Sequence, residues 1–142
     1  MKTAIKVSAI LIALLAGFFA NTFFAKPDNT AFVPSADNAC FLSSSPCVQD
    51  QVTMTLSQDS PHALTPITLT VNWPSSQSST LNLSLSGLEM NMGNPMFKLK
   101  QIKNGEYQGT IVLPACTLNS MTWLGKLTDG THTVYPAIRT TR

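Results

Sequence analysis

Apolar residues alternate with polar ones over much of the chain, and this period of two is the feature that most constrains the fold. The alternating segments are 52–56, 67–73, 81–85, 97–99 and 107–113, and two further strand candidates cover 121–127 and 131–140. A β-strand points successive side chains to opposite faces, so such a segment has one face to bury and one to expose. No stretch after residue 25 has the apolar spacing of a helix of useful length. The sequence therefore predicts an all-β exported domain.

Turn signals separate these segments. Asn104-Gly105 and Asp129-Gly130 are dipeptides that favour hairpin turns, and prolines fall at or near the other expected strand ends. About seven short strands, with turns roughly every 8 to 15 residues, are typical of an immunoglobulin-like antiparallel β-sandwich. We take that architecture as the expected fold class.

The first 25 residues have a different character. Val7 to Ala25 carry no charge, and as a helix they would extend about 28 Å, close to the thickness of a bilayer core. A signal peptide cut after Ala25 or Ala20 would need a small side chain where Phe23 or Phe18 stands. The sequence favours an uncleaved membrane anchor, and a cleaved, soluble periplasmic form is the alternative.

Charge predicts the orientation of this anchor. Lys2, Lys6 and the amino terminus outweigh Lys26 on the other side, which leaves the amino terminus in the cytoplasm and exports the rest. The next stretch, KPDNTAFVPSADNA, is rich in Pro, Asn, Asp and small residues and resembles a tether. The expected organisation is an inner-membrane anchor over 1–25, a linker over 26–39 and a periplasmic domain over 40–142.

Composition and motifs exclude several classes of function. Only 11% of the residues are charged, the formal net charge is +2 and no basic cluster is present, which argues against a nucleic-acid partner. The sequence lacks the common nucleophile, metalloprotease, C-x-x-C and phosphate-loop motifs, and its acidic residues are not paired locally. We therefore expect no enzymatic activity.

His62 and His132 lie in turn-like contexts and are expected to be solvated surface residues.

Three cysteines lie in the exported part, where disulfides persist. Cys40 and Cys47 enclose the short loop CFLSSSPC and are the favoured pair, while a bond from either of them to Cys116 is the rival. Both pairings leave one thiol over. A leftover cysteine in an exported protein indicates a reactive thiol, an intermolecular bond or a soft metal ligand.

The stretch EMNMGNPM contains three methionines, Met90, Met92 and Met96. A thioether is neutral and polarisable and suits Cu(I) rather than hard cations. Residues i and i+2 of a strand share a side, so Met90 and Met92 could clasp one soft ion. A further ligand could come from Met96, Met121 or Cys116. The alternative is that these methionines are flexible fillers of the core.

A change of register at Gly87 bears on this choice, because apolar residues occupy odd positions before it and even positions after it. Such a slip moves later side chains to the opposite face of a strand. If Gly87 forms a bulge, Met90 and Met92 return to the core. If it does not, they lie on the outer surface or the rim. The ligand hypothesis also requires the loop that carries Cys116 to lie at the same end of the domain.

The segment 81–127, together with the amino-terminal anchor, resembles the FixH and YtkA-like group of membrane-anchored, exported β-sandwich domains. The residues that carry the resemblance are the M-x-M pair, the G-x-Y-x-G strand and a following aromatic residue, namely Met90, Met92, Gly105, Tyr107, Gly109 and Trp123. The resemblance implies copper handling, or assembly of haem-copper respiratory oxidases, on the outer face of the inner membrane. The cysteines depart from the simplest FixH pattern and mark a cysteine-containing relative.

Two functions are therefore expected as alternatives. The first is Cu(I) binding at the methionine-rich strand end, with transfer to an oxidase-assembly or copper-trafficking partner. The second is a non-metal structural or interaction module that docks onto a membrane protein, since methionine-rich surfaces adapt to different partners. A thiol-redox role of Cys116 is a third possibility.

Overall fold

The alternating segments form β-strands in the computed structural model, which describes residues 36–142, all within one compact unit, Pro34–Arg142. A short 3-10 helix, η1 (Ala36–Asn38), precedes the strands. The strands are β1 (Cys40–Phe41), β2 (Cys47–Gln49), β3 (Val52–Leu56), β4 (Ile67–Asn72), β5 (Thr80–Gly87), β6 (Met96–Lys103), β7 (Glu106–Ile111), β8 (Ser120–Thr128), β9 (Thr133–Val134) and β10 (Pro136–Thr141).

The expected anchor over 1–25, and the part of the expected linker up to residue 35, lie outside the described residues. Within 36–142, no helix has the length and apolar character needed to cross a membrane.

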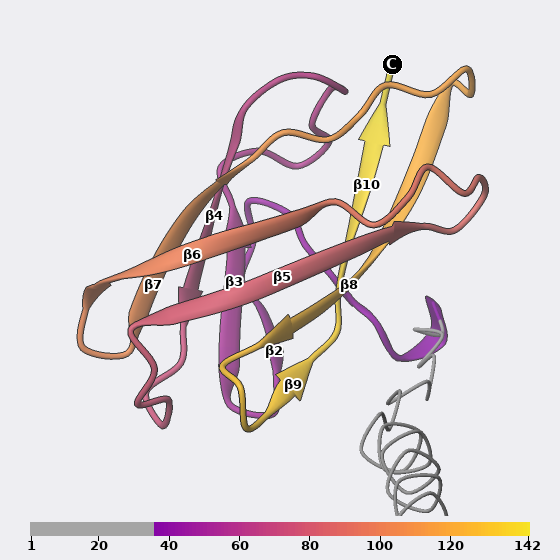
Figure 1. The fold of residues 1–142 in the computed structure, drawn as a ribbon. Coiled ribbons are helices and arrows are strands. Elements are labelled where there is room, and N and C mark those ends of the chain that lie inside the picture. The colour runs from indigo at the N-terminus through magenta and orange to yellow at the C-terminus, as the bar shows by residue number, and fades with distance from the viewer. Residues whose placement is uncertain (1–35) are drawn as a thin grey trace, which may run out of the picture. The chain divides into compact units, whose positions relative to one another are not determined.

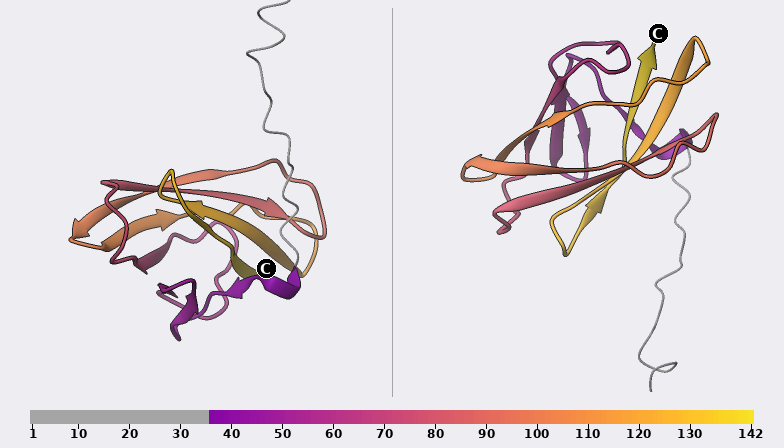
Figure 2. Two further views of the ribbon diagram at one scale, coloured as in Figure 1. Left: turned by 90° about the horizontal axis from the view of Figure 1, so that it is seen from below. Right: turned by 45° about the horizontal axis from the view of Figure 1, so that its top comes forward.

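All ten strands join into one hydrogen-bonded sheet that curls into a nearly closed barrel (Figure 1). Their order is β1-β10-β8-β5-β6-β7-β4-β3-β2, and β9 pairs with β8. Neighbouring strands are antiparallel except for β1 and β10, which are parallel. Figure 2 shows the result: the half of the sheet formed by β5, β6 and β7 lies over the half that contains β2 and β3.

The all-β prediction is confirmed, whereas the expectation of about seven strands in a two-sheet sandwich differs from the single ten-stranded sheet. Alternation does not distinguish the two architectures, because each strand has one buried and one exposed face in both. The strands that the sequence did not indicate, β1 and β2, have only 2 and 3 residues. Such short strands cannot display a period.

The last predicted strand is divided into β9 and β10. Val134 lies opposite Leu127, and Ala137 lies opposite Leu124, so both pieces keep one register against β8. Tyr135 stands between them, and Pro136, the first residue of β10, has no backbone N–H to donate, which interrupts the ladder of hydrogen bonds.

The two ends of the sheet, β1 and β2, meet at a seam. On one side of the seam, the backbone N–H of Leu42 donates to a carbonyl of β10 over 2.8 Å. On the other side, the N–H of Leu56 in β3 donates to the carbonyl of Ser43, also over 2.8 Å. The disulfide between Cys40 and Cys47 joins β1 to β2. The favoured cysteine pairing is therefore confirmed, and the bond closes the sheet.

Asp59 also holds the connection between β1 and β2, which runs across the seam. The hydroxyl and the backbone N–H of Ser44 both donate to the Asp59 carboxylate, over 2.5 and 2.8 Å. These hydrogen bonds, that of the hydroxyl first, lower the pKa of Asp59.

The core fills the inside of the barrel, and the side chains that the period of two pointed inward are buried. They are Val52, Met54, Leu56, Ile67, Leu69, Val71, Trp73, Leu81, Leu83, Leu85, Leu99, Tyr107, Ile111 and Leu113, joined by Met121, Trp123 and Leu127 of β8. Burial of a large apolar side chain contributes roughly 1.5–3 kcal/mol. The predicted hairpin at Asn104-Gly105 is confirmed, since Lys103 pairs with Glu106 across it.

Replacing Cys40 and Cys47 together by serine should lower the free energy of unfolding by roughly 2–3 kcal/mol, because the unfolded chain loses its cross-link. Chemical denaturation followed by tryptophan fluorescence measures this difference. Cys116→Ser is the matched control, since it makes the same substitution but keeps the seam closed, and it should change stability by less than about 1 kcal/mol. Equal stability of the double variant and the wild type would contradict a stabilising role of the bond.

Candidate functional site

The methionine-rich stretch begins where β5 ends. β5 pairs regularly with β8 as far as Gly87, and residues 88–95, which we call the methionine loop, then lead to β6. Met90 and Met92 therefore belong to a loop at the rim of the barrel and not to a continuing strand. Of the two expected outcomes at Gly87, the bulge is absent from the β5 pairing, and the rim position arises because the strand ends there.

Gly87 allows the chain to reverse at this point. A Cβ atom added to Gly87 would overlap the Met121 methyl group and the Met90 carbonyl oxygen. The backbone at Met90 thus folds back over Gly87, while Met121 packs against it from below. Met121 is 1% exposed, so it belongs to the core beneath the loop.

Glu89 ties the start of the methionine loop to β8. The N–H of Leu88 donates to the carbonyl of Thr122 (2.9 Å), and the N–H of Thr122 donates to the Glu89 carboxylate (2.7 Å). Partial burial raises the pKa of Glu89, but the hydrogen bonds from Thr122 and the charge of Arg139 outweigh it and leave the pKa below its ordinary value. The Arg139 guanidinium also donates to the hydroxyl of Thr122 over 3.3 Å. A charged carboxylate therefore holds the loop in place.

The remainder of the methionine loop is closed by its own polar groups. The N–H of Gly93 donates to the side-chain oxygen of Asn91 over 3.1 Å, which is a local turn motif. The carbonyl of Pro95 accepts the N–H of Leu85 over 3.0 Å and leads the chain into β6.

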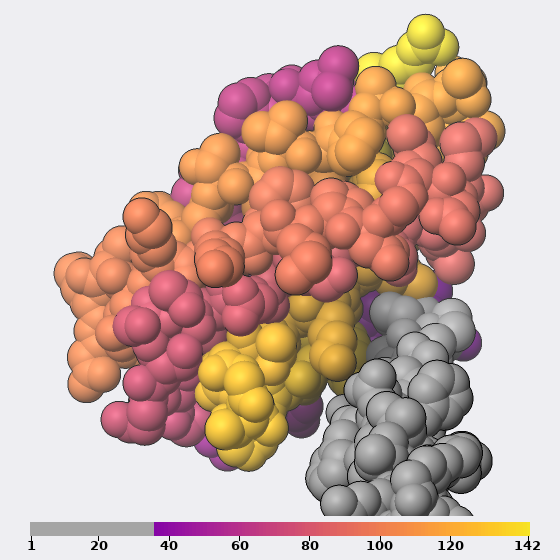
Figure 3. Space-filling model, in the orientation of Figure 1, coloured from indigo at the N-terminus to yellow at the C-terminus, as the bar shows by residue number. Residues whose placement is uncertain are grey.

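Cys116 lies in the connection from β7 to β8, residues 112–119, which we call the cysteine loop. Antiparallel pairing places the end of β5 beside the start of β8, and the end of β7 beside the start of β6. The cysteine loop therefore starts and finishes at the rim that carries the methionine loop. Figures 1 and 3 show both loops at the same edge of the molecule. This meets the positional condition that the ligand hypothesis set.

Backbone hydrogen bonds fix the cysteine loop to its neighbours. The carbonyl of Leu113 accepts the N–H of Leu64 over 2.8 Å, and the carbonyl of Asn119 accepts the N–H of Arg142 over 3.0 Å. The connection from β3 to β4 and the carboxyl-terminal residue thus belong to the same rim.

Three predicted ligands lie at this rim. Met90 is 37% exposed, whereas Met92 and Cys116 are half-buried and pack against the same core. The thiol of Cys116 donates to the carbonyl of Leu118 over 3.7 Å. Cys116 is the free cysteine of the described residues.

The other two predicted ligands are placed differently. Met96 pairs with Ser84, a residue of β5 whose two neighbouring leucines point inward. The side chain of Met96 is 73% exposed and faces away from the core. Met121 is buried in the core. The fold thus gathers Met90, Met92 and Cys116 at the rim, with Met121 beneath them and Met96 on the outer surface.

The sequence-based reasoning missed a second property of this rim, its exposed apolar character. Of the nine large apolar side chains that residues 36–142 expose, five lie here: Leu64, Leu88, Met90, Val112 and Leu118. We call this set the apolar rim. All five lie in loops or beside strand ends where no period applies, so only the tertiary structure gathers them.

Histidine and carboxylate ligands do not add to the site. His62 is exposed at the rim, and its ring nitrogen Nδ1 lies 3.1 Å from the carbonyl oxygen of Arg142. Within residues 36–142, no three His, Cys, Asp or Glu side chains form a group that could hold a metal ion. The chemistry of the rim therefore rests on its sulfur atoms and apolar side chains.

No family model, curated protein or solved structure matches this chain.

Replacing Glu89 by glutamine should lower stability at pH 7 and weaken its dependence on pH in acid. The pKa of Glu89 in the folded state lies below its ordinary value of 4.5, so the carboxylate stabilises the fold at pH values above 4.5. This contribution is lost as the pH falls through the folded-state pKa. Unfolding midpoints from pH 7 down to about pH 3 measure the effect. Identical pH dependence in Glu89→Gln and the wild type would contradict the anchoring role.

Proposed function

We propose that the domain is a non-enzymatic exported protein that binds Cu(I) as cargo at the barrel rim through Met90, Met92 and Cys116. The observation that supports this proposal is that two loops far apart in the sequence bring their sulfur-bearing residues to one end of the barrel. Met92 and Cys116 both pack, half-buried, against one core.

The chemistry of these residues fits a soft monovalent ion. Thioethers bind Cu(I) without having to lose a proton, and a thiolate adds a strong ligand and a negative charge. The disulfide between Cys40 and Cys47 leaves Cys116 available for this role. Exposure of Met90 gives an ion access, while the half-buried positions of the other two residues limit competition by water.

The proposal gives no direct ligand role to the other two methionines. Met121 would have to leave the core, where it packs against Gly87, before its sulfur could reach an ion. Met96 faces outward from β6 and provides an internal comparison.

The wider setting is part of the same proposal. Residues 1–25 anchor the chain in the inner membrane, the domain lies in the periplasm, and copper passes to a trafficking or oxidase-assembly partner, as in the FixH and YtkA-like group. The disulfide supports an exported location, since such bonds persist in oxidising compartments. A form cleaved to a soluble periplasmic protein would carry the same rim.

Competition between the full-length, reduced protein and a Cu(I) chelator tests the proposal. We expect one ion per chain, and we expect Met90→Leu with Met92→Leu to weaken binding by about tenfold or more, which corresponds to about 1.4 kcal/mol. Leucine keeps a similar apolar volume, so the fold should persist. Cys116→Ser should weaken binding at least as strongly, because it removes the thiolate.

Met96→Leu is the matched control, because it removes a thioether from the same stretch of sequence but from the outward face. Its affinity for Cu(I) should equal that of the wild type. Wild-type affinity in the Met90 and Met92 double variant would refute the site, as would equal losses in the double variant and the control.

The apolar rim favours a second candidate function, docking onto a membrane protein partner. Exposed apolar residues that gather in one place mark interaction surfaces more often than scattered ones do. Since Met90 belongs to both the rim and the metal hypothesis, substitutions elsewhere in the rim separate the two functions.

Replacing Leu88 and Leu118 by lysine should abolish cross-linking of the rim to a membrane partner in intact cells, with Cu(I) affinity unchanged. Lysine places a charge in an apolar contact and so opposes its burial. Val48→Lys is the control, since Val48 is 65% exposed on β2 and lies outside the rim. Equal cross-linking in the rim variant and the wild type would exclude docking through this surface.

A further inference from the structure

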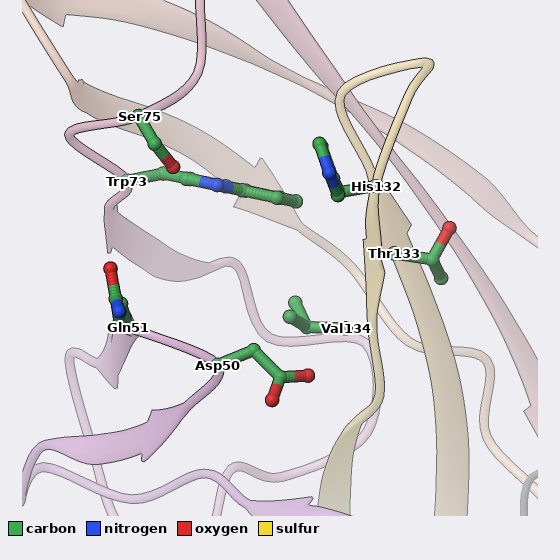
Figure 4. Close-up of a pocket in the computed structure, with 7 residues that line it drawn as sticks. All are labelled: Asp50, Gln51, Trp73, Ser75, His132, Thr133 and Val134. Carbon is green, nitrogen blue, oxygen red and sulfur yellow. The ribbon is translucent and has the colours of Figure 1, made fainter.

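The end of the barrel opposite the apolar rim contains a cavity of about 330 Å³. Three connections build it: the turn between β2 and β3, the stretch that follows β4, and the loop that leads into β9. Figure 4 shows Trp73 and His132 on one side of this cavity, Asp50 on the other and Val134 between them. The volume lies at the lower end of the range of about 300–1,000 Å³ that is usual for small-molecule sites.

The turn between β2 and β3 places two side chains at the cavity, and its backbone has positive φ at both residues. Asp50 and Gln51 form a two-residue hairpin loop, with φ angles of 47° and 65°. Hairpins of this kind favour Asn-Gly, because glycine adopts positive φ without steric cost. Aspartate tolerates the left-handed region, but glutamine has no such preference. Strained residues of this kind are found where a side chain serves a ligand.

The opposite wall is held by Asp129. Its carboxylate accepts the backbone N–H of Thr131 and of His132, both over 2.8 Å, and the hydroxyl of Thr131 over 2.8 Å. Partial burial raises the pKa of Asp129, but hydrogen bonds from His132, Thr131 and the Ser76 side chain outweigh it and lower the pKa to about 2. Because Ser76 adjoins the stretch after β4, Asp129 links two of the three connections that line the cavity.

The electrostatic character of the cavity is negative. The Asp50 carboxylate is its one acidic group, and no lysine or arginine lines it. The ion pair found among residues 36–142 joins Lys103 to Glu106, so Asp50 has no cationic partner there. The side chains of Gln51 and Ser75 offer further hydrogen-bond acceptors. An anion would meet repulsion in this cavity, whereas a cation would meet a carboxylate and neutral acceptors.

We propose that this cavity binds a small organic ammonium ion, whose charged head pairs with Asp50 and whose short apolar stem contacts Val134 and Trp73. An ammonium group has three hydrogen-bond donors and no acceptor, which matches a cavity lined by a carboxylate and by the side-chain oxygens of Gln51 and Ser75. Val134 and Trp73 line the cavity, and because they are 1% and 3% exposed and pack in the core, their positions at its wall are fixed. The site lies at the other end of the barrel from the copper proposal and does not depend on it.

Titration of the full-length protein with n-butylammonium, 1-butanol and butyrate tests the site, since the three compounds share one stem and differ in charge. The indole N–H signals in a nitrogen–proton correlation spectrum report binding: Trp73 lines the cavity, and Trp123, which is 0% exposed, serves as internal reference. We expect a saturable shift of the Trp73 signal with butylammonium, about tenfold weaker affinity for butanol, and no shift with butyrate.

Asp50→Asn removes the charge but keeps the shape and tolerance of positive φ, so it should fold and bind butylammonium about tenfold more weakly. Glu89→Gln is the matched control, because it also turns a carboxylate into an amide but does so at the opposite rim, outside the cavity, and its affinity should stay within about threefold of the wild type. Absence of any Trp73 shift with butylammonium, equal affinity for butanol or butyrate, or unchanged affinity in Asp50→Asn would each overturn the proposal.

Discussion

Closure of the sheet at the seam between β1 and β2 is the constraint on which the rest of this structure depends. A sheet that buries only one face can enclose a core only if its first and last strands meet. Here they meet through the disulfide between Cys40 and Cys47 and through the hydrogen bonds of the crossing that follows β1. Both edge strands are short, so few unpaired backbone groups are left to pair with another chain. The disulfide and these hydrogen bonds thus join the two edges of a nearly closed barrel.

Once the sheet is closed, its loops gather at two ends of different chemistry. One end carries the apolar rim and three sulfur-bearing residues, and the other carries a small cavity with a carboxylate. Each end is shaped by an acidic side chain that accepts backbone N–H groups: Glu89 holds the methionine loop to β8, and Asp129 holds a wall of the cavity. Asp59 does the same at the crossing between β1 and β2. Hydrogen bonds lower the pKa of all three carboxyl groups: at Asp59 the Ser44 hydroxyl contributes most, and at Glu89 and Asp129 backbone N–H groups do.

The strands and their inward residues could be predicted from the sequence, because the alternation of apolar and polar residues along each long strand indicates which side of it is buried. The hairpin at Asn104-Gly105 and the cysteine pairing were likewise local, since each involves residues close together in the chain. The number of sheets could not be predicted, because a sandwich and a curled sheet bury the same faces. The change of register at Gly87 was visible in the sequence, but its result was not: the strand ends there, because the backbone at Met90 folds back over Gly87.

The sequence by itself therefore determined that the domain is built from strands, which side of each long strand is buried and which cysteines lie close enough to join. Only the tertiary structure decided that the methionine and cysteine loops share a rim, that Met121 lies beneath it and Met96 outside it, and that Asp50 and Trp73 line the same cavity. The physical reason is that periodicity reports the environment of a residue within its own strand. The proximity of two loops depends instead on strand order and register, which arise only when the whole sheet closes.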